Sequence, residues 1–140
     1  MSARFRDKTV AAALALAAGV LGGHRFYLRG WRDPLGWLHP PLLLVGLWGG
    51  WRFVSFGPTD PDARDALPLL ALSVGIALLQ AVLIGLTPDS RWDARWNVGC
   101  SRSSASGWGA VIVIAIALLS GAAALMAGLA YFLLQSFQAG

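Results

Sequence analysis

The sequence predicts an all-α, polytopic integral membrane protein with four transmembrane helices, and three observations favour this fold class. Hydrophobic residues make up 56% of the 140 residues and charged residues only 13%, whereas soluble domains carry about 25% charged residues. The apolar residues form long runs between short polar segments, and about 20 such residues cross the hydrocarbon layer as a helix. The seven Trp residues lie at or near the ends of these runs, as expected for side chains that prefer the membrane interface. As interfacial anchors we expect Trp31, Trp48, Trp51, Trp92, Trp96 and Trp108.

The polar residues narrow the class of function. The net charge is +4, but the basic residues lie between apolar runs rather than in one stripe, which argues against a nucleic acid partner. Anionic lipid headgroups are the expected counter-charge. The chain has no Glu, no nucleophile elbow and no Gly-rich phosphate loop followed by Lys, so we expect no catalytic residue and no enzyme. Two His and one Cys without helical pairing predict no metal site and no cofactor.

The first predicted span runs from about residue 9 to residue 28 and follows a short basic tail that ends at Lys8. Four small residues recur in it at four-residue intervals, and such a face lets a neighbouring helix approach closely. These residues are Ala11, Ala15, Gly19 and Gly23. An Ala-rich segment also produces such a stripe by chance, and both explanations stay open.

A cleavable signal peptide is the alternative for this first segment. The basic start, the apolar centre and Ala15-Leu16-Ala17 as a cleavage site all fit one. We favour a retained helix, because apolar residues resume at Phe26-Tyr27-Leu28 and lead into a second span.

A polar and aromatic turn between the first two predicted spans is the candidate functional segment. Arg and Tyr can place their polar ends among headgroups while their carbon bodies stay in the apolar layer. The residues expected to contact lipid or a protein partner are His24, Arg25, Phe26, Tyr27, Arg29 and Arg32. In a helical turn its three Arg residues share one side and fit a phosphate group. The simpler interpretation is that they anchor the helix ends.

The second predicted span runs from about residue 34 to residue 53 and begins at a Pro, which a first helical turn tolerates. Pro40 and Pro41 predict a kink inside this span, and His39 comes just before them. Gly46 and Gly50 are four residues apart and form another small-residue face for helix packing.

The second half of the chain is predicted to hold the other two spans. The polar loop of residues 57–66 contains three Asp residues, which we interpret as turn and helix-capping residues rather than a cation site. Residues 67–86 form the third span, in which Gln80 is the only strongly polar side chain. An interfacial loop of residues 87–107 follows. The fourth span covers about residues 108–135.

Two further patterns occur in these segments. Residues 88–96 predict a short helix in the membrane interface, because Trp92 and Trp96 are four apart and share a face. In the fourth span, a third small-residue stripe for helix packing consists of Ser120, Ala124 and Gly128.

Four spans place the N-terminal tail, the second loop and the C-terminus on one side of the membrane. Five basic residues then lie on that side and six on the other, so the positive-inside rule barely discriminates. We expect the first and third loops to be cytoplasmic. The abundance of Arg and Ala with a single Lys indicates a GC-rich bacterial genome, so the expected location is a bacterial inner membrane.

Residues 19–28 read Gly-Val-Leu-Gly-Gly-His-Arg-Phe-Tyr-Leu and follow Lys8. This segment resembles the TM2 domain family, whose members carry a Lys before a first helix, a Gly-rich helix end, a His-Arg-Phe-Tyr-Leu-Gly turn and a second helix. The resemblance covers about residues 8–56, and it departs at Arg52, where the family commonly has Asp. It implies a two-helix membrane hairpin without an established enzymatic activity.

The expected organisation is therefore a TM2-like hairpin in residues 1–56 and a second pair of helices in residues 57–140. The expected role is a small membrane scaffold or accessory subunit that binds the lipid bilayer, a membrane protein partner or further copies of itself. The alternative is an oligomeric channel or transporter, in which His39 beside the Pro pair lines a cavity in a broken helix.

Overall fold

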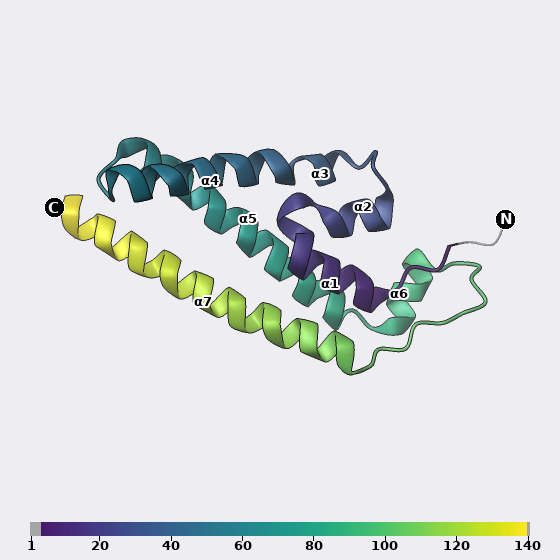
Figure 1. The fold of residues 1–140 in the computed structure, drawn as a ribbon. Coiled ribbons are helices and arrows are strands. Elements are labelled where there is room, and N and C mark those ends of the chain that lie inside the picture. Colours follow the sequence, from purple (N-terminus) through teal and green to yellow (C-terminus); the bar gives the residue numbers. More distant parts are fainter. Residues whose placement is uncertain (1–3, 140) are drawn as a thin grey trace.

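The computed structural model describes residues 4–139, and within that range it contains helices and no strand (Figure 1). An all-α fold is therefore confirmed. In chain order the elements are α1 (Lys8–Ala18), the 3-10 helix η1 (Gly19–Leu21), α2 (Gly23–Arg29), α3 (Pro34–Trp37), α4 (His39–Phe56), α5 (Pro61–Leu86), α6 (Asp89–Trp96) and α7 (Trp108–Ala139).

The long helix α5 lies at the centre of the bundle. Helix α4 packs along it on one side and α7 on the other, while α1 contacts both α5 and α7 (Figure 1). The core between α1, α5 and α7 is made of small residues, with Ala15, Ala81 and Ala117 almost fully buried around Leu78. Small side chains let these helices approach closely, as in membrane helix packing.

The predicted first span is not one helix, because the chain reverses direction after Ala18. Helix α1 has 11 residues and rises only about 16 Å at 1.5 Å per residue. Gly22 then adopts a left-handed conformation with φ of 76°, and a Cβ there would lie 2.5 Å from the carbonyl oxygen of Gly36. Only glycine fits both conditions. The chain returns through α2, so α1, η1 and α2 form a hairpin at one end of the bundle (Figure 1).

The predicted second span is also divided, but not by the expected kink. Helix α3 ends at Trp37 and α4 begins at His39, so Pro40 and Pro41 lie in the first turn of α4. Backbone N–H groups there have no partner within the helix, and Pro therefore costs little at these positions. The Pro pair marks a helix start rather than a kink in its middle.

Within residues 4–139, two helices, not four, are long and apolar enough by length and composition to cross a membrane. They are α5 and α7, with 26 residues in α5. Helix α5 begins six residues before the predicted third span, because Asp60 caps it and Pro61 occupies its first turn. The predicted short helix after α5 is present as α6.

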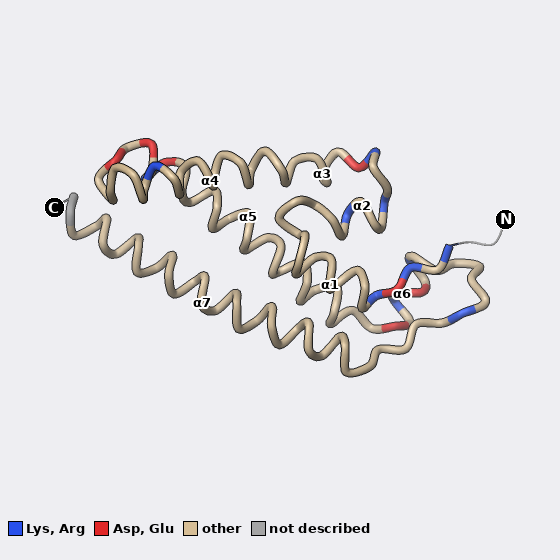
Figure 2. The backbone as a smooth tube through the Cα atoms, viewed as in Figure 1, with Lys and Arg blue, Asp and Glu red and all other residues tan. Residues whose placement is uncertain are grey.

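The charged residues gather at the two ends of the bundle, with an uncharged stretch between them (Figure 2). The N-terminal tail lies beside α6, not beside the loop of residues 57–60 as four spans would require. The loop between α2 and α3 lies at the same end as α6 (Figure 2). The tail lies at this end because the hairpin of α1, η1 and α2 returns the chain to the end from which it started.

The predicted small-residue faces are met in part. In the first, Ala11 and Ala15 are buried, and a Cβ on Gly19 would lie 2.7 Å from the Cβ of Ala77, while Gly23 lies against Ala18. In α4, Gly46 contacts the backbone of α5, but Gly50 meets only side-chain atoms at 3.8 Å.

Gly49 replaces Gly50 in this contact, because a Cβ there would lie 2.5 Å from the Leu67 nitrogen. In α7, Ser120 is exposed and Gly128 has open space around it. The face towards α5 instead contains Ala110, Ala117 and Gly121, with Ala124 partly buried.

Candidate functional site

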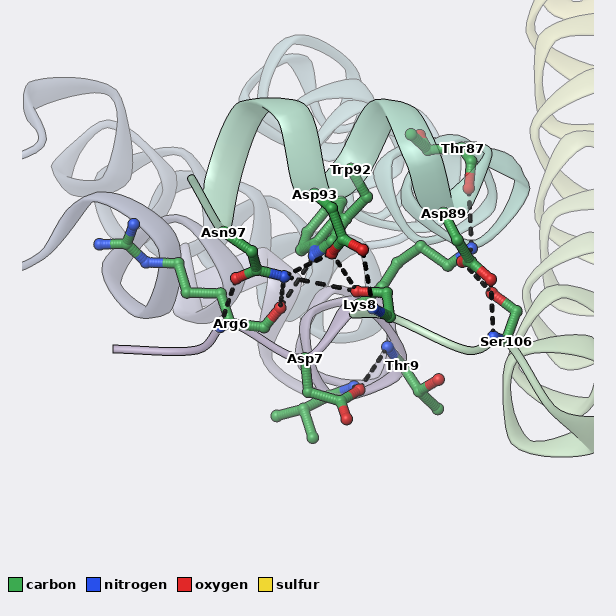
Figure 3. Close-up of polar contacts among 12 residues, drawn as sticks. Arg6, Asp7, Lys8, Thr9, Thr87, Asp89, Trp92, Asp93, Asn97 and Ser106 are labelled. Carbon is green, nitrogen blue, oxygen red and sulfur yellow. Dashed lines mark hydrogen bonds and ion pairs between the residues drawn. The ribbon is translucent and has the colours of Figure 1, made fainter. Parts of the chain in front are cut away.

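The N-terminal tail is joined to α6 by hydrogen bonds between segments far apart in the sequence (Figure 3). The backbone N–H of Arg6 donates to Asn97 Oδ1 at 2.8 Å, and Trp92 Nε1 donates to the Arg6 carbonyl oxygen at 2.8 Å. Asn97 Nδ2 also donates to that carbonyl oxygen at 3.2 Å. These bonds fix the entry of the chain into α1 against the buried face of α6.

Lys8 occupies the centre of this network although it is the first residue of α1. Its side chain is only 5% exposed, and its Nζ donates to Asp89 Oδ1 at 2.5 Å and to the Thr87 carbonyl oxygen at 2.7 Å (Figure 3). The hydrogen bonds from Lys8 and then from Ser106 lower the pKa of Asp89 to about 2. A buried ammonium group requires such compensation, since desolvation of an unpaired charge costs several kcal/mol.

The same aspartates hold the loop that follows α6. Ser106 N–H donates to Asp89 Oδ2 at 2.8 Å, and Ser104 N–H donates to Asp93 Oδ2 at 2.7 Å. The Ser104 hydroxyl donates to Asp93 Oδ1 at 2.6 Å, and the bonds from Ser104 and Asn97 lower the pKa of Asp93. The two aspartates are four apart on α6, so one face of this helix connects the tail to the loop.

Sequence reasoning missed this network of Lys8, Asp89, Asp93 and Asn97 as a structural site. The pairing of Lys8 with Asp89 spans 81 positions, which no local pattern encodes. Two features of the sequence could have indicated the network. Lys8 is the single Lys of the chain, and Asp89 and Asp93 share one helix face.

The residues predicted for a headgroup turn lie in a helix, α2, and in the loop after it. Tyr27 Oη accepts a hydrogen bond from the Asp7 N–H at 3.0 Å, so it binds the tail rather than pointing away from the protein. Phe26 stacks on Trp31 with ring centroids 4.9 Å apart and lies 5.2 Å from the ring of Trp37. Phe26 therefore packs on Trp residues of the following loop and of α3.

The three arginines predicted to share a phosphate do not act as one cluster. Arg25 Nε lies 2.6 Å from Asp33 Oδ2, and Arg29 Nη1 lies 4.0 Å from Asp33 Oδ1. The hydrogen bond from Arg25 lowers the pKa of Asp33, which is only 6% exposed. Arg32 is exposed. Asp33 therefore neutralises part of the positive charge for which the sequence predicted a lipid headgroup as the partner.

The predicted interfacial Trp residues differ in their surroundings. Trp31, Trp48, Trp51 and Trp108 are all exposed. Trp92 is not, since it is 3% exposed and packs against Ala11 and Leu28. Its ring lies 6.0 Å from that of Trp96, so the expected common face is present, but this face covers the hairpin instead of standing free at the interface.

Two buried histidines, His24 from α2 of the hairpin and His39 from the start of α4, meet at the side of the hairpin. The rings of His24 and His39 lie 5.9 Å apart in an edge-to-face arrangement. His39 Nδ1 is 2.7 Å from the Leu35 carbonyl oxygen. Within residues 4–139, both ring nitrogens of His24 and the Nε2 of His39 have no hydrogen-bond partner. Such buried polar groups are uncommon and call for an explanation, and the Gln80 side chain lies beside His24.

At the opposite end of the bundle, Arg52 binds the start of α5. Its guanidinium contacts Asp60 through Nη2 at 2.6 Å and Nε at 3.1 Å, and Asp62 at 3.1 Å. Asp60 Oδ1 also accepts from the Ala63 N–H at 2.8 Å, which confirms the predicted helix cap. The bond from Arg52 lowers the pKa of Asp60.

Substitutions of Asp60 separate these two roles. We expect Asp60→Ala to lower the thermal unfolding temperature more than Asp60→Asn, because Asn keeps the helix cap and loses only the ion pair. Thermal unfolding in detergent, followed by Trp fluorescence, measures both. Equal losses would show that the cap contributes nothing.

In the part of the chain that the structure describes, no three His, Cys, Asp or Glu side chains gather as metal ligands would. Compared with protein-family models, curated proteins and solved structures, the chain has no match.

Proposed function

We propose that this protein is an integral scaffold or accessory subunit of a bacterial inner membrane, with three crossings and one re-entrant hairpin. Helices α5 and α7, the two described helices that are long and apolar enough by themselves, each cross. The third crossing combines α3 and α4 as a broken helix beside α5, because neither of these two helices suffices alone. The hairpin of α1, η1 and α2 enters and leaves on one side. Non-helical backbone at membrane depth requires cover by protein, and the burial of Gly19 and Gly22 in the bundle fits this requirement.

The distribution of charge carries the proposal. Of the eleven basic residues, nine belong to the tail and the start of α1, to α2 and the loop after it, and to α6 and the loop after it, while Arg52 and Arg64 belong to α4 and α5 at the other end. Figure 2 shows charge at both of these ends. The nine are Arg4, Arg6, Lys8, Arg25, Arg29, Arg32, Arg91, Arg95 and Arg102. By the positive-inside rule the end that holds the tail and α6 is cytoplasmic. Four spans divide the basic residues five against six, which favours neither orientation. Three crossings divide them nine against two and therefore favour one orientation.

The outer face of α7 supports a role in assembly. Many of its large apolar side chains are exposed, among them Leu119, Leu125, Met126 and Phe132. In a membrane this face meets lipid or another apolar helix. Within the TM2 resemblance, residues 8–56 are the shared part, and the segment that holds α5 and α7 is the part that varies.

Reporter fusions test this topology. Three crossings place the N-terminus in the cytoplasm and the C-terminus outside, so a C-terminal alkaline phosphatase is active and a C-terminal fluorescent protein is dark. An N-terminal fluorescent protein is bright. Four crossings put both termini on one side, and equal behaviour of the two ends would refute the proposal. Native mass spectrometry of gently extracted protein then identifies partner subunits.

A transporter or channel is the second candidate, and the buried His24 and His39 favour it. Transport proteins place ionisable residues beside broken helices near a substrate path. A liposome flux assay that compares the protein with His39→Ala and with empty vesicles tests this candidate. Equal flux in all three would exclude it for the solutes used.

A further inference from the structure

A cavity of about 210 Å³ lies between α2, α5 and α6, at the basic end of the bundle. Four arginines line it, namely Arg25, Arg29, Arg91 and Arg95, and no Asp does. The arginines form two pairs with four-residue spacing, so each helix presents both of its guanidinium groups on one face. Two separate helices thus direct positive charge into the same space.

Most of this charge lacks a carboxylate partner. Asp33 pairs with Arg25 and lies 4.0 Å from Arg29, while within residues 4–139 no ion pair is found for Arg91 or Arg95. Arg95 stacks over the Trp96 ring, with its Cζ 5.3 Å from the ring centroid. Such stacking holds a guanidinium in place and leaves its N–H groups available.

His24 is a second and independent sign of a ligand. It lines the cavity and is 2% exposed, and neither of its ring nitrogens has a partner of full hydrogen-bond geometry in the described residues, although the Gln80 side chain lies close enough to interact with it. Gln80 lines the same wall. A buried ring N–H without a well-placed acceptor is costly, and a ligand oxygen in the cavity would accept a hydrogen bond from the His24 N–H.

We propose that this cavity binds a phosphate group, carried either by an anionic phospholipid or as free phosphate. Arginine forks match phosphate oxygens in geometry and charge. The volume is below the about 300–1,000 Å³ typical of sites for drug-sized ligands, so it suits one phosphate-sized group. The exposed Leu83 and the partly exposed Trp96 border the arginines and offer an apolar surface for a lipid chain.

The position of the cavity at the level of the lipid headgroups rests on the proposed function, which places the protein in the membrane. The arginine set does not depend on the number of crossings, because α2 and α6 share one side in the three-crossing and in the four-crossing topology. If the reporter fusions contradict the three-crossing topology, the proposed phosphate site is not affected. If the binding test contradicts the phosphate site, the topology is not affected.

The test is native mass spectrometry of the full chain in detergent with added short-chain phosphatidylglycerol, phosphatidylcholine or inorganic phosphate. We expect retention of phosphatidylglycerol or of phosphate, and at least about tenfold weaker binding for the Arg91→Gln/Arg95→Gln double variant. Both side chains are exposed, so this variant is expected to fold. The control is Arg64→Gln/Arg102→Gln, which removes the same charge from exposed sites outside the cavity.

The ligands distinguish the two sources. Retention of phosphatidylglycerol but not of phosphate assigns the site to a lipid, and retention of phosphate alone assigns it to the free anion. Equal losses in the cavity variant and in the control would overturn the proposal, as would binding of neither ligand or equal binding of phosphatidylcholine.

Discussion

Replacing Gly49 by Ala is expected to destabilise the fold by about 1–3 kcal/mol, as overpacking does in other tightly packed cores. A Cβ at this position would lie 2.5 Å from the Leu67 nitrogen and 2.6 Å from the Ala66 carbonyl carbon. These are backbone atoms of α5, which cannot rotate away as a side chain can. Gly46→Ala meets the backbone of Leu70 at 2.5 Å and is expected to cost a similar amount.

Gly50 provides the matched control on the same helix. A Cβ there would meet only side-chain atoms at 3.8 Å, which is ordinary contact. Because Ala is favoured over Gly in a helix by up to about 1 kcal/mol, Gly50→Ala is expected to be neutral or stabilising. Thermal unfolding in detergent measures all three variants. If the three behaved alike, the close approach of α4 and α5 would be wrong.

The second large effect concerns the ion pair between the tail and α6. Asp89→Asn is expected to lower the free energy of unfolding by about 2 kcal/mol. Loss of one partner in a fully buried pair costs about 3–5 kcal/mol, and the effect is smaller here because the Asp89 side chain is 31% exposed. The 5% exposed Lys8 would keep its bond to the Thr87 carbonyl oxygen but lose its carboxylate.

The same pair predicts a dependence on pH. The pKa of Asp89 is lowered from 3.8 to about 2 in the folded protein. Its contribution to stability is therefore complete above about pH 4 and is lost as the pH falls towards 2. Asp89→Asn should flatten this part of the stability profile. Asp65→Asn, which removes a 78% exposed partner of Arg64, is the control and should change neither stability nor the profile.

The sequence predicted those parts of the fold that local patterns determine. The long apolar runs correspond to α5 and α7, and four-residue spacing identified α6 with its common Trp92 and Trp96 face. Asp and Pro at the start of α5 act as the expected cap. In each case the sequence pattern and the element that it predicts lie in the same short segment of the chain, so periodicity and capping chemistry were sufficient.

The hairpin could not be predicted in this way, because Ala and Gly fit a continuous helix and a reversal of direction equally well. The relevant signals were the shortness of the first apolar run and the paired Gly22 and Gly23. The decision depends on Gly22 packing against Gly36, a contact between two elements. The pairing of Lys8 with Asp89 could not be predicted either, because it is also a contact between two elements that are far apart in the sequence. With the hairpin missed, the tail was also expected at the wrong end of the bundle, since it lies beside α6.

Cross-linking of the tail to the loop after α6, in intact membranes, tests the re-entrant hairpin most directly. Arg102 Cζ lies 4.6 Å from the Phe5 ring centroid, so Phe5→Cys and Arg102→Cys, in a Cys100→Ser background, should be joined by a short bis-maleimide. The control pair is Phe5→Cys with Thr59→Cys, which we expect to remain unjoined at opposite ends of the bundle. A bridged first pair, seen by mass spectrometry, is the predicted result. Four crossings would separate residues 5 and 102 by about 30 Å of hydrocarbon, and the absence of that bridge would contradict the hairpin.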